Sequence, residues 1–195
     1  MAQTPSTMLP LGTPAPDFRL PDYHGKSVEL ADFAEQRLLL VMFICNHCPY
    51  VKHVRSELAA LRRDFPDSEL AIVAINPNDV VAYPADNAEN MAKEAAAAGY
   101  RFPYLLDETQ AVAKAYRAAC TPDFFLFDAG RKLIYRGQLD GSRPGNGQPL
   151  TGADLRRAIT SALAGQPIAG EQRPSIGCNI KWKPSNAPDY YGGAK

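Results

Sequence analysis

Two of the four cysteines in this sequence, Cys45 and Cys48, lie three positions apart in the run ICNHCPYV. Two thiols at this spacing can act in turn, since Cys45 can form a mixed disulfide with a substrate and Cys48 can then resolve it. In such a pair the first cysteine is usually the exposed attacker and the second is more buried. The spacing therefore predicts thiol-disulfide exchange.

The segments on either side of the pair predict where it sits. Residues 38–44 are apolar without alternation, which is typical of a strand covered on both faces by helices. Residues 51–65 carry apolar side chains at helical spacing, and Pro49 is favourable only in the first turn of a helix. The pair thus lies at a helix N-terminus, where unpaired N–H groups and a partial positive charge favour a thiolate.

Three further residues are candidates for supporting roles. His47 precedes Cys48, and its potentially cationic ring should favour the thiolate and make the disulfide easier to reduce. Thr121 and Pro122 stand just before the apolar run FFLF. A proline there cannot lie inside a strand, and in a cis form it would bring the backbone of Thr121 close to another element. The alternative is an ordinary trans proline in a turn.

The remaining cysteines, Cys120 and Cys178, leave alternatives open. Cys178 could fold back as a third redox partner or be a bystander, and Cys120 could be a small buried side chain. The CxxC could also be half of a zinc site completed by these two or by a histidine. Because a second CxxC or an HxxxH is absent from the sequence, we favour redox chemistry and predict no metal or cofactor.

The rest of the chain predicts an alternation of strands and helices. Strand 38–44, helix 51–65 and strand 69–76 follow one another, so a right-handed crossover and parallel pairing are expected. The later segments predicted are a loop at 79–86, helix 87–98 ended by Gly99, strand 104–106, helix 109–118, a hairpin of DFFLFD and KLIYRGQ, and a last helix that begins with a capping box at Thr151 and Asp154 and ends at Gly165.

Composition narrows the class of protein. A chain of 195 residues with 46% hydrophobic side chains fits one domain, 1–195, with an irregular lead-in at about 1–13 and an irregular tail at about 166–195. Lys plus Arg equals Asp plus Glu at 21 each, so we expect neither nucleic acid nor a membrane as a partner. The first residues lack the features of a signal peptide, and we expect a cytoplasmic protein.

Several runs together resemble a known family. The segment APDFRLPDYHGKSVELADF, the CNHC motif and the Thr121-Pro122 pair resemble the thioredoxin superfamily over about residues 14–165, specifically its redoxin (AhpC/TSA-like) branch. The runs CNHCPYVKH, CTPDFFLFD, RGQLDGSRPGN and SIGCNIKWK resemble a bacterial thioredoxin-like or peroxiredoxin-like subfamily. The resemblance implies an α/β fold of thioredoxin type, with a central mixed β-sheet flanked by helices.

The resemblance also implies roles for the site residues. Cys45 would be the nucleophile and Cys48 the resolving thiol, while Thr121 and Pro122 would form the backbone platform on which an extended peptide pairs. Cys120, next to that platform, would come near the pair. The implied substrate is a protein disulfide, with an unidentified thiol as electron donor.

Two other functions stay open. Peroxiredoxins carry Thr where this chain has Cys45, and their peroxide-attacking cysteine matches Cys48, so Cys48 could be peroxidatic with Cys45 resolving. Such a site needs an arginine, for which Arg136 and Arg143 are candidates. The third possibility is a non-catalytic zinc or partner-binding module.

Overall fold

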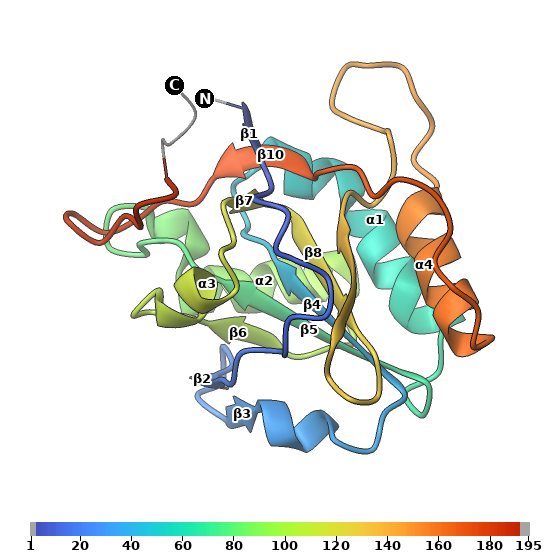
Figure 1. Ribbon diagram of the computed structural model, residues 1–195. Helices are drawn as coiled ribbons and strands as arrows, with labels where there is room; N and C mark the ends of the chain where they lie inside the picture. The colour runs from blue at the N-terminus through green and yellow to red at the C-terminus, as the bar shows by residue number, and fades with distance from the viewer. Residues whose placement is uncertain (1–2, 192–195) are drawn as a thin grey trace.

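The core of the protein is a five-stranded mixed sheet, shown in Figure 1 in a computed structural model that describes residues 3–191. The strands β6, β5 and β4 run parallel to one another, and β8 and β9 continue the sheet antiparallel to their neighbours. In sheet order their bounds are Tyr104–Leu106, Leu70–Asn76, Leu38–Phe43, Asp123–Phe127 and Leu133–Gly137. The predicted parallel pairing after the crossover and the predicted hairpin are both confirmed.

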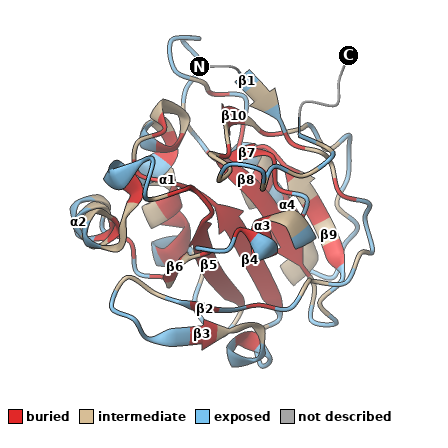
Figure 2. Ribbon diagram, turned by 90° about the vertical axis from the view of Figure 1, so that its left-hand side faces the viewer, coloured by how far each residue is buried: buried red, intermediate tan, exposed pale blue. Residues whose placement is uncertain are grey.

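Both faces of this sheet are covered, as the unbroken apolar run in β4 predicted. Successive residues of β4 enter opposite clusters, with Leu40 and Met42 in one and Leu39 and Val41 in the other. The helices α1 (Pro49–Asp64), α2 (Ala88–Ala98) and α4 (Ala153–Leu163) cover the first face. The second face is covered by α3 (Ala111–Ala115), the hairpin of β2 (Arg19–Pro21) and β3 (Ser27–Glu29), and the 3-10 helix η1 (Leu30–Phe33). Figure 2 shows the central strands buried along their length, whereas each helix is buried on one side.

A second, smaller sheet corrects the prediction of irregular ends. The segment 1–13 contains β1 (Gln3–Pro5), and the segment 166–195 contains β10 (Ile176–Asn179). Strand β10 lies between β1 and β7 (Cys120–Thr121), antiparallel to both. Strands this short have too few residues to show an alternating pattern, and they are stabilised by pairing with distant parts of the chain.

Two helix starts and one loop also differ from the sequence-based expectation. The capping box at Thr151 is not formed: Gly152 precedes α4 in the left-handed region, and Asp140 Oδ2 accepts the N–H groups of Thr151 and Gly152 at 2.7 Å each. The helix expected at 109–118 is confined to α3, and the loop at 79–86 contains the 3-10 helix η2 (Pro84–Asp86). Within residues 3–191, none of the helices combines the length and apolar character needed to cross a bilayer.

Candidate active site

The cysteine pair lies at the junction between β4 and α1, as predicted. Cys48 is the N-cap residue of α1, and Pro49 occupies the first helical position. Both thiols are free, and both residues are buried, with 1% of Cys45 and none of Cys48 exposed. The expectation of an exposed first cysteine is therefore wrong, because the chain around the junction covers both sulfurs.

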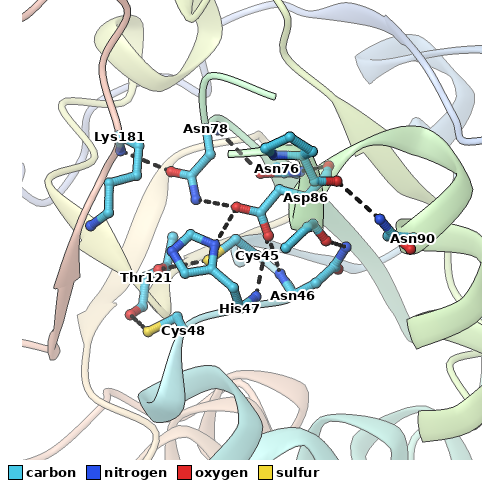
Figure 3. A network of polar contacts seen from close by, with 12 residues as sticks. Cys45, Asn46, His47, Cys48, Asn76, Asn78, Asp86, Asn90, Thr121 and Lys181 are labelled. Atoms are coloured by element: carbon cyan, nitrogen blue, oxygen red, sulfur yellow. Dashed lines mark hydrogen bonds and ion pairs between the residues drawn. The ribbon is translucent and has the colours of Figure 1, made fainter. Parts of the chain in front are cut away.

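Both cysteine sulfurs contact Thr121, a residue far from them in the sequence. The Thr121-Pro122 peptide bond is cis, which confirms the less ordinary of the two interpretations. Cys45 Sγ lies 3.3 Å from Thr121 Oγ1, and Cys48 Sγ lies 3.2 Å from the main-chain oxygen of the same residue (Figure 3). One residue thus contacts both members of the pair.

The surroundings of the pair favour a thiolate on Cys48 over one on Cys45. A hydrogen bond from the Cys45 thiol, opposed by burial and assisted by Cys178, lowers the pKa of Cys48 to about 5. Burial, followed by the interaction with Cys48, raises the pKa of Cys45 well above its usual range. The two pKa shifts therefore favour ionisation of Cys48 over ionisation of Cys45. This arrangement supports the alternative in which Cys48 reacts first.

A buried carboxylate, Asp86, holds the loop between the two cysteines and was not predicted as a site residue. Its Oδ1 accepts the N–H groups of Asn46 at 2.8 Å and His47 at 3.2 Å, and its Oδ2 lies 2.6 Å from His47 Nδ1 and accepts Asn78 Nδ2 at 2.8 Å (Figure 3). Burial opposes ionisation, but hydrogen bonds from His47 and Asn78 outweigh it, and the pKa of Asp86 is lowered. Nothing in its sequence context distinguishes Asp86 from other acidic residues in loops.

His47 lies beside the pair but faces Asp86. Because Asp86 is an ionised acceptor, His47 Nδ1 carries a proton and donates it. The His47 ring also stacks on the Tyr83 ring, with ring centroids 5.6 Å apart. Three side chains could together hold a metal ion, those of Cys45, His47 and Asp86. Each offers one ligand atom, and the three atoms lie within 4.8 Å of one another. The hydrogen bonds already accepted by both oxygens of Asp86 make this a poor fit to zinc, and metal analysis of the purified protein tests the fit.

The two further cysteines differ in their relation to the pair. Cys178, on β10, is paired in register with Thr121, and both its thiol and its N–H hydrogen-bond Cys48. Cys120 is buried, and its sulfur lies 3.6 Å from the main-chain oxygen of Pro122. Cys120 thus has the surroundings of a small buried side chain, and a redox role for it stays a prediction.

The two arginines suggested for a peroxide-binding site are used elsewhere. Arg136 donates to the main-chain oxygen of Leu9 and to Gln172. Arg143 donates to two main-chain oxygens of its own loop and to Gln138. Among the described residues, neither guanidinium hydrogen-bonds a cysteine of the pair, and a peroxide-binding role for either stays a prediction. Arg136 lies in β9, opposite Phe125, and Arg143 lies in the loop between β9 and α4.

Comparisons with known proteins agree with this architecture. The model of the AhpC/TSA family matches residues 11–136. A putative peroxiredoxin from Mycobacterium tuberculosis is 30% identical over 115 residues, which are 59% of this chain and 68% of that protein. Crystal structures of an uncharacterized conserved protein from Geobacillus kaustophilus and a hypothetical protein from Sinorhizobium meliloti share 54% and 52% identity, with TM-scores of 0.92 and 0.91. These matches cover 95% and 92% of this chain and 98% of each of those chains.

More distant structures show the fold. A putative thiol:disulfide interchange protein from Chlorobium tepidum has a TM-score of 0.63 at 23% identity, covering 80% of this chain and 99% of that one. The mixed sheet flanked by helices is therefore the thioredoxin-like fold predicted from the sequence. The chain belongs to the AhpC/TSA family, the redoxin branch of the thioredoxin superfamily, whose members are thiol-disulfide oxidoreductases and peroxiredoxin-like proteins.

Proposed function

We propose that this protein is a thiol peroxidase in which the Cys48 thiolate attacks a hydroperoxide and Cys45 resolves the product. The proposal is carried by the position of Cys48 as the N-cap residue of α1, together with the direction of the pKa shifts, downward for Cys48 and upward for Cys45. This assignment exchanges the roles that the resemblance to CxxC oxidoreductases implies. The thiolate is the reactive form of cysteine, so the sulfur that holds the charge should react first.

The two cysteines supply the nucleophile, the proton and the resolving sulfur of the cycle, and a thiol donor supplies the final reduction. Cys48 attacks one peroxide oxygen, the O–O bond breaks, and Cys48 becomes a sulfenic acid while an alkoxide leaves. Cys45, which hydrogen-bonds Cys48, gives its proton to the alkoxide and becomes a thiolate. This thiolate attacks the sulfenic sulfur, hydroxide leaves, and the Cys45–Cys48 disulfide forms. A thiol donor then reduces the disulfide, and the cytoplasmic location expected from the sequence would supply one.

Burial of the reacting sulfur favours a small substrate. Cys48 has no exposed surface, and the edge of β7 expected to carry a peptide is already paired with β10. A hydroperoxide can reach a buried sulfur through a small local opening, whereas an extended peptide would first have to displace a strand.

A second candidate function is exchange with a protein disulfide, with Cys45 as the attacking sulfur. The observation in its favour is that the edge of β7 does accept an extended, cysteine-containing strand, namely β10. If β10 moved away, a substrate peptide could take its place opposite Thr121. This function requires that β10 exchange with the substrate.

Peroxide treatment of cysteine variants distinguishes the two functions. In a Cys178→Ser background, which leaves only the pair near the site, Cys45→Ser should accumulate a sulfenic acid on Cys48 that dimedone traps. Cys48→Ser should form no sulfenic acid on Cys45, and its peroxide consumption should fall about a thousandfold or more. Peptide mass spectrometry locates the adduct, and Cys120→Ser serves as the matched control with unchanged oxidation.

The opposite pattern would contradict the proposal. If Cys45 carried the adduct in Cys48→Ser, or if Cys48→Ser trapped a model disulfide through Cys45, the protein would be a disulfide oxidoreductase with the roles that the sequence implied.

A further inference from the structure

Strand β10 occupies the edge of β7 on which a substrate peptide was expected to pair. Cys178 lies opposite Thr121, and Asn179 lies opposite Cys120. On its other side β10 is held by β1, from Gln3 opposite Cys178 to Pro5 opposite Ile176. Figure 1 shows β10 crossing the end of the molecule where α1 begins. The chain thus places a strand of its own over the cysteine pair.

A glycine allows this strand to lie close to the backbone at Thr121. A Cβ atom added at Gly177 would stand 2.0 Å from the main-chain oxygen of Thr121 and 2.6 Å from its carbonyl carbon. Real Cβ atoms do not approach backbone atoms so closely, and a main-chain carbonyl cannot rotate away as a side chain would. Any other residue at position 177 would therefore move β10 away from the site.

The close approach brings a third sulfur to Cys48. The thiol and the N–H of Cys178 both hydrogen-bond the Cys48 sulfur, and Cys178 is 1% exposed. Cys48 therefore has a thiol neighbour from its own loop, Cys45, and another from β10. Burial and the neighbouring Cys48 raise the pKa of Cys178 to about 12, so Cys178 is a protonated donor to the thiolate.

We propose that Cys178 is a third redox-active thiol, which resolves oxidised Cys48 by forming a Cys48–Cys178 disulfide in competition with Cys45. This inference rests on the proposed oxidation of Cys48. The Cys178 sulfur attacks the sulfur of the Cys48 sulfenic acid, the S–S bond forms, the S–O bond breaks, and the departing hydroxide takes the Cys178 proton to give water. Cys178 lies opposite Thr121, whose main-chain oxygen is 3.2 Å from Cys48 Sγ, so both cysteines lie beside the same backbone group.

The Cys48–Cys178 disulfide can then be exchanged for a Cys45–Cys48 disulfide. Cys45, as a thiolate, attacks the Cys48 sulfur of the new disulfide, so that the Cys45–Cys48 bond forms and Cys178 leaves as a thiolate that takes up a proton. Cys178 thereby protects Cys48 from further oxidation whenever peroxide arrives faster than Cys45 reacts. A disulfide between α1 and β10 also fixes the strand over the platform, and an extended peptide cannot pair there until the bond is broken.

Disulfide mapping in the absence of Cys45 tests the proposal. After one equivalent of hydrogen peroxide, Cys45→Ser should contain the Cys48–Cys178 disulfide in most molecules, whereas Cys45→Ser with Cys178→Ser should keep a dimedone-reactive sulfenic acid on Cys48. Cys45→Ser with Cys120→Ser is the matched control and should form the disulfide to the same extent. Nonreducing peptide mass spectrometry measures all three.

The outcomes separate this inference from the proposed function. An equal, persistent sulfenic acid on Cys48 in Cys45→Ser, with or without Cys178, would overturn the role of Cys178 and leave the peroxidase intact. An unoxidised Cys48 in both variants would overturn the proposed function, and this inference with it.

A variant that keeps both Cys48 and Cys178 tests whether the position of β10 brings Cys178 to Cys48. In the Cys45→Ser background, Gly177→Ala should slow formation of the Cys48–Cys178 disulfide at least about tenfold, because the added methyl group collides with Thr121. Gly130→Ala is the matched control, since a Cβ there would meet only Asp128 Oδ1 at 3.4 Å, and it should leave the rate unchanged. An unchanged rate in a folded Gly177→Ala protein would contradict the proposal, and should this variant not fold, the Cys178→Ser comparison decides.

Discussion

Replacement of Asp86 with alanine should lower the free energy of unfolding by about 3–5 kcal/mol. The carboxylate is fully buried and accepts hydrogen bonds from Asn46, His47 and Asn78. Without it, two main-chain N–H groups, an imidazole N–H and an amide N–H lose their acceptor, and the donors of Asn46 and Asn78 are buried away from water. Chemical denaturation monitored by circular dichroism measures the loss, and a change below about 1 kcal/mol would mean that the loop between the cysteines is held by other contacts.

The matched variant Asp86→Asn separates charge from shape. This variant should lose less stability than the alanine variant. The amide oxygen still accepts some of the hydrogen bonds donated to Asp86, whereas the amide NH₂ group faces other donors. The pKa of Asp86 is depressed below its ordinary value of 3.8, so the stability that its charge contributes is present above that value and is lost as the pH falls through the lower, folded-state pKa. The difference between wild type and Asp86→Asn should therefore be largest near neutral pH and shrink below about pH 4.

The elements that carry the pair could be predicted because their signals are local. The apolar run of β4, the helical spacing of α1 and Pro49 at its first position each depend on neighbouring residues only. Together they place the two cysteines at a strand-to-helix junction, and the structure agrees. The cis form of Thr121-Pro122 is predictable only because the cysteine pair upstream suggests a fold in which such a bond lies close to the pair.

The parts of the site that could not be predicted depend on long-range contacts. Asp86 lies 40 positions from Asn46, and Cys178 lies far beyond Thr121 in the sequence. A loop carboxylate and a cysteine in a short, glycine-containing strand leave no periodic pattern, and their roles arise only when the chain folds back. Gly177 is informative only once the backbone of Thr121 is known to lie beside it.

Which of the two cysteines is more easily ionised also could not be predicted from the sequence. A helix N-terminus favours a thiolate at either position, so the pattern alone could not say which cysteine is charged. In the folded chain, burial raises the pKa of Cys45, whereas the interaction with Cys45 lowers the pKa of Cys48. Family resemblance pointed to both assignments, since the CxxC motif matches oxidoreductases and the position of Cys48 matches the peroxide-attacking cysteine of peroxiredoxins.

A pH titration of thiolate absorbance at 240 nm should show one thiolate forming with a midpoint at about pH 5, the pKa of Cys48. The other three thiols should contribute no thiolate absorbance below pH 8. Burial is the largest of the effects that raise the pKa of Cys45, Cys120 and Cys178. Since the Cys48 pKa is depressed, the thiolate predominates above pH 5 and is lost as the pH falls below it. Cys48→Ser should abolish the step, and a step that persists in this variant would assign the charge to another sulfur.

Cys45→Ala should move this midpoint upward by about 1–2 pH units. A hydrogen bond to a charged group contributes about 1.5–3 kcal/mol, and each pH unit corresponds to about 1.4 kcal/mol. At pH 5 the variant should therefore hold roughly a tenth of the wild-type thiolate, and dimedone-trapped oxidation of Cys48 by peroxide should slow by about tenfold at that pH. Cys45→Ser keeps a hydroxyl donor and should shift the midpoint less than alanine does. If both variants kept the wild-type midpoint, the low pKa of Cys48 would have to come from Cys178 and the helix, and Cys45 would act as a resolving thiol alone.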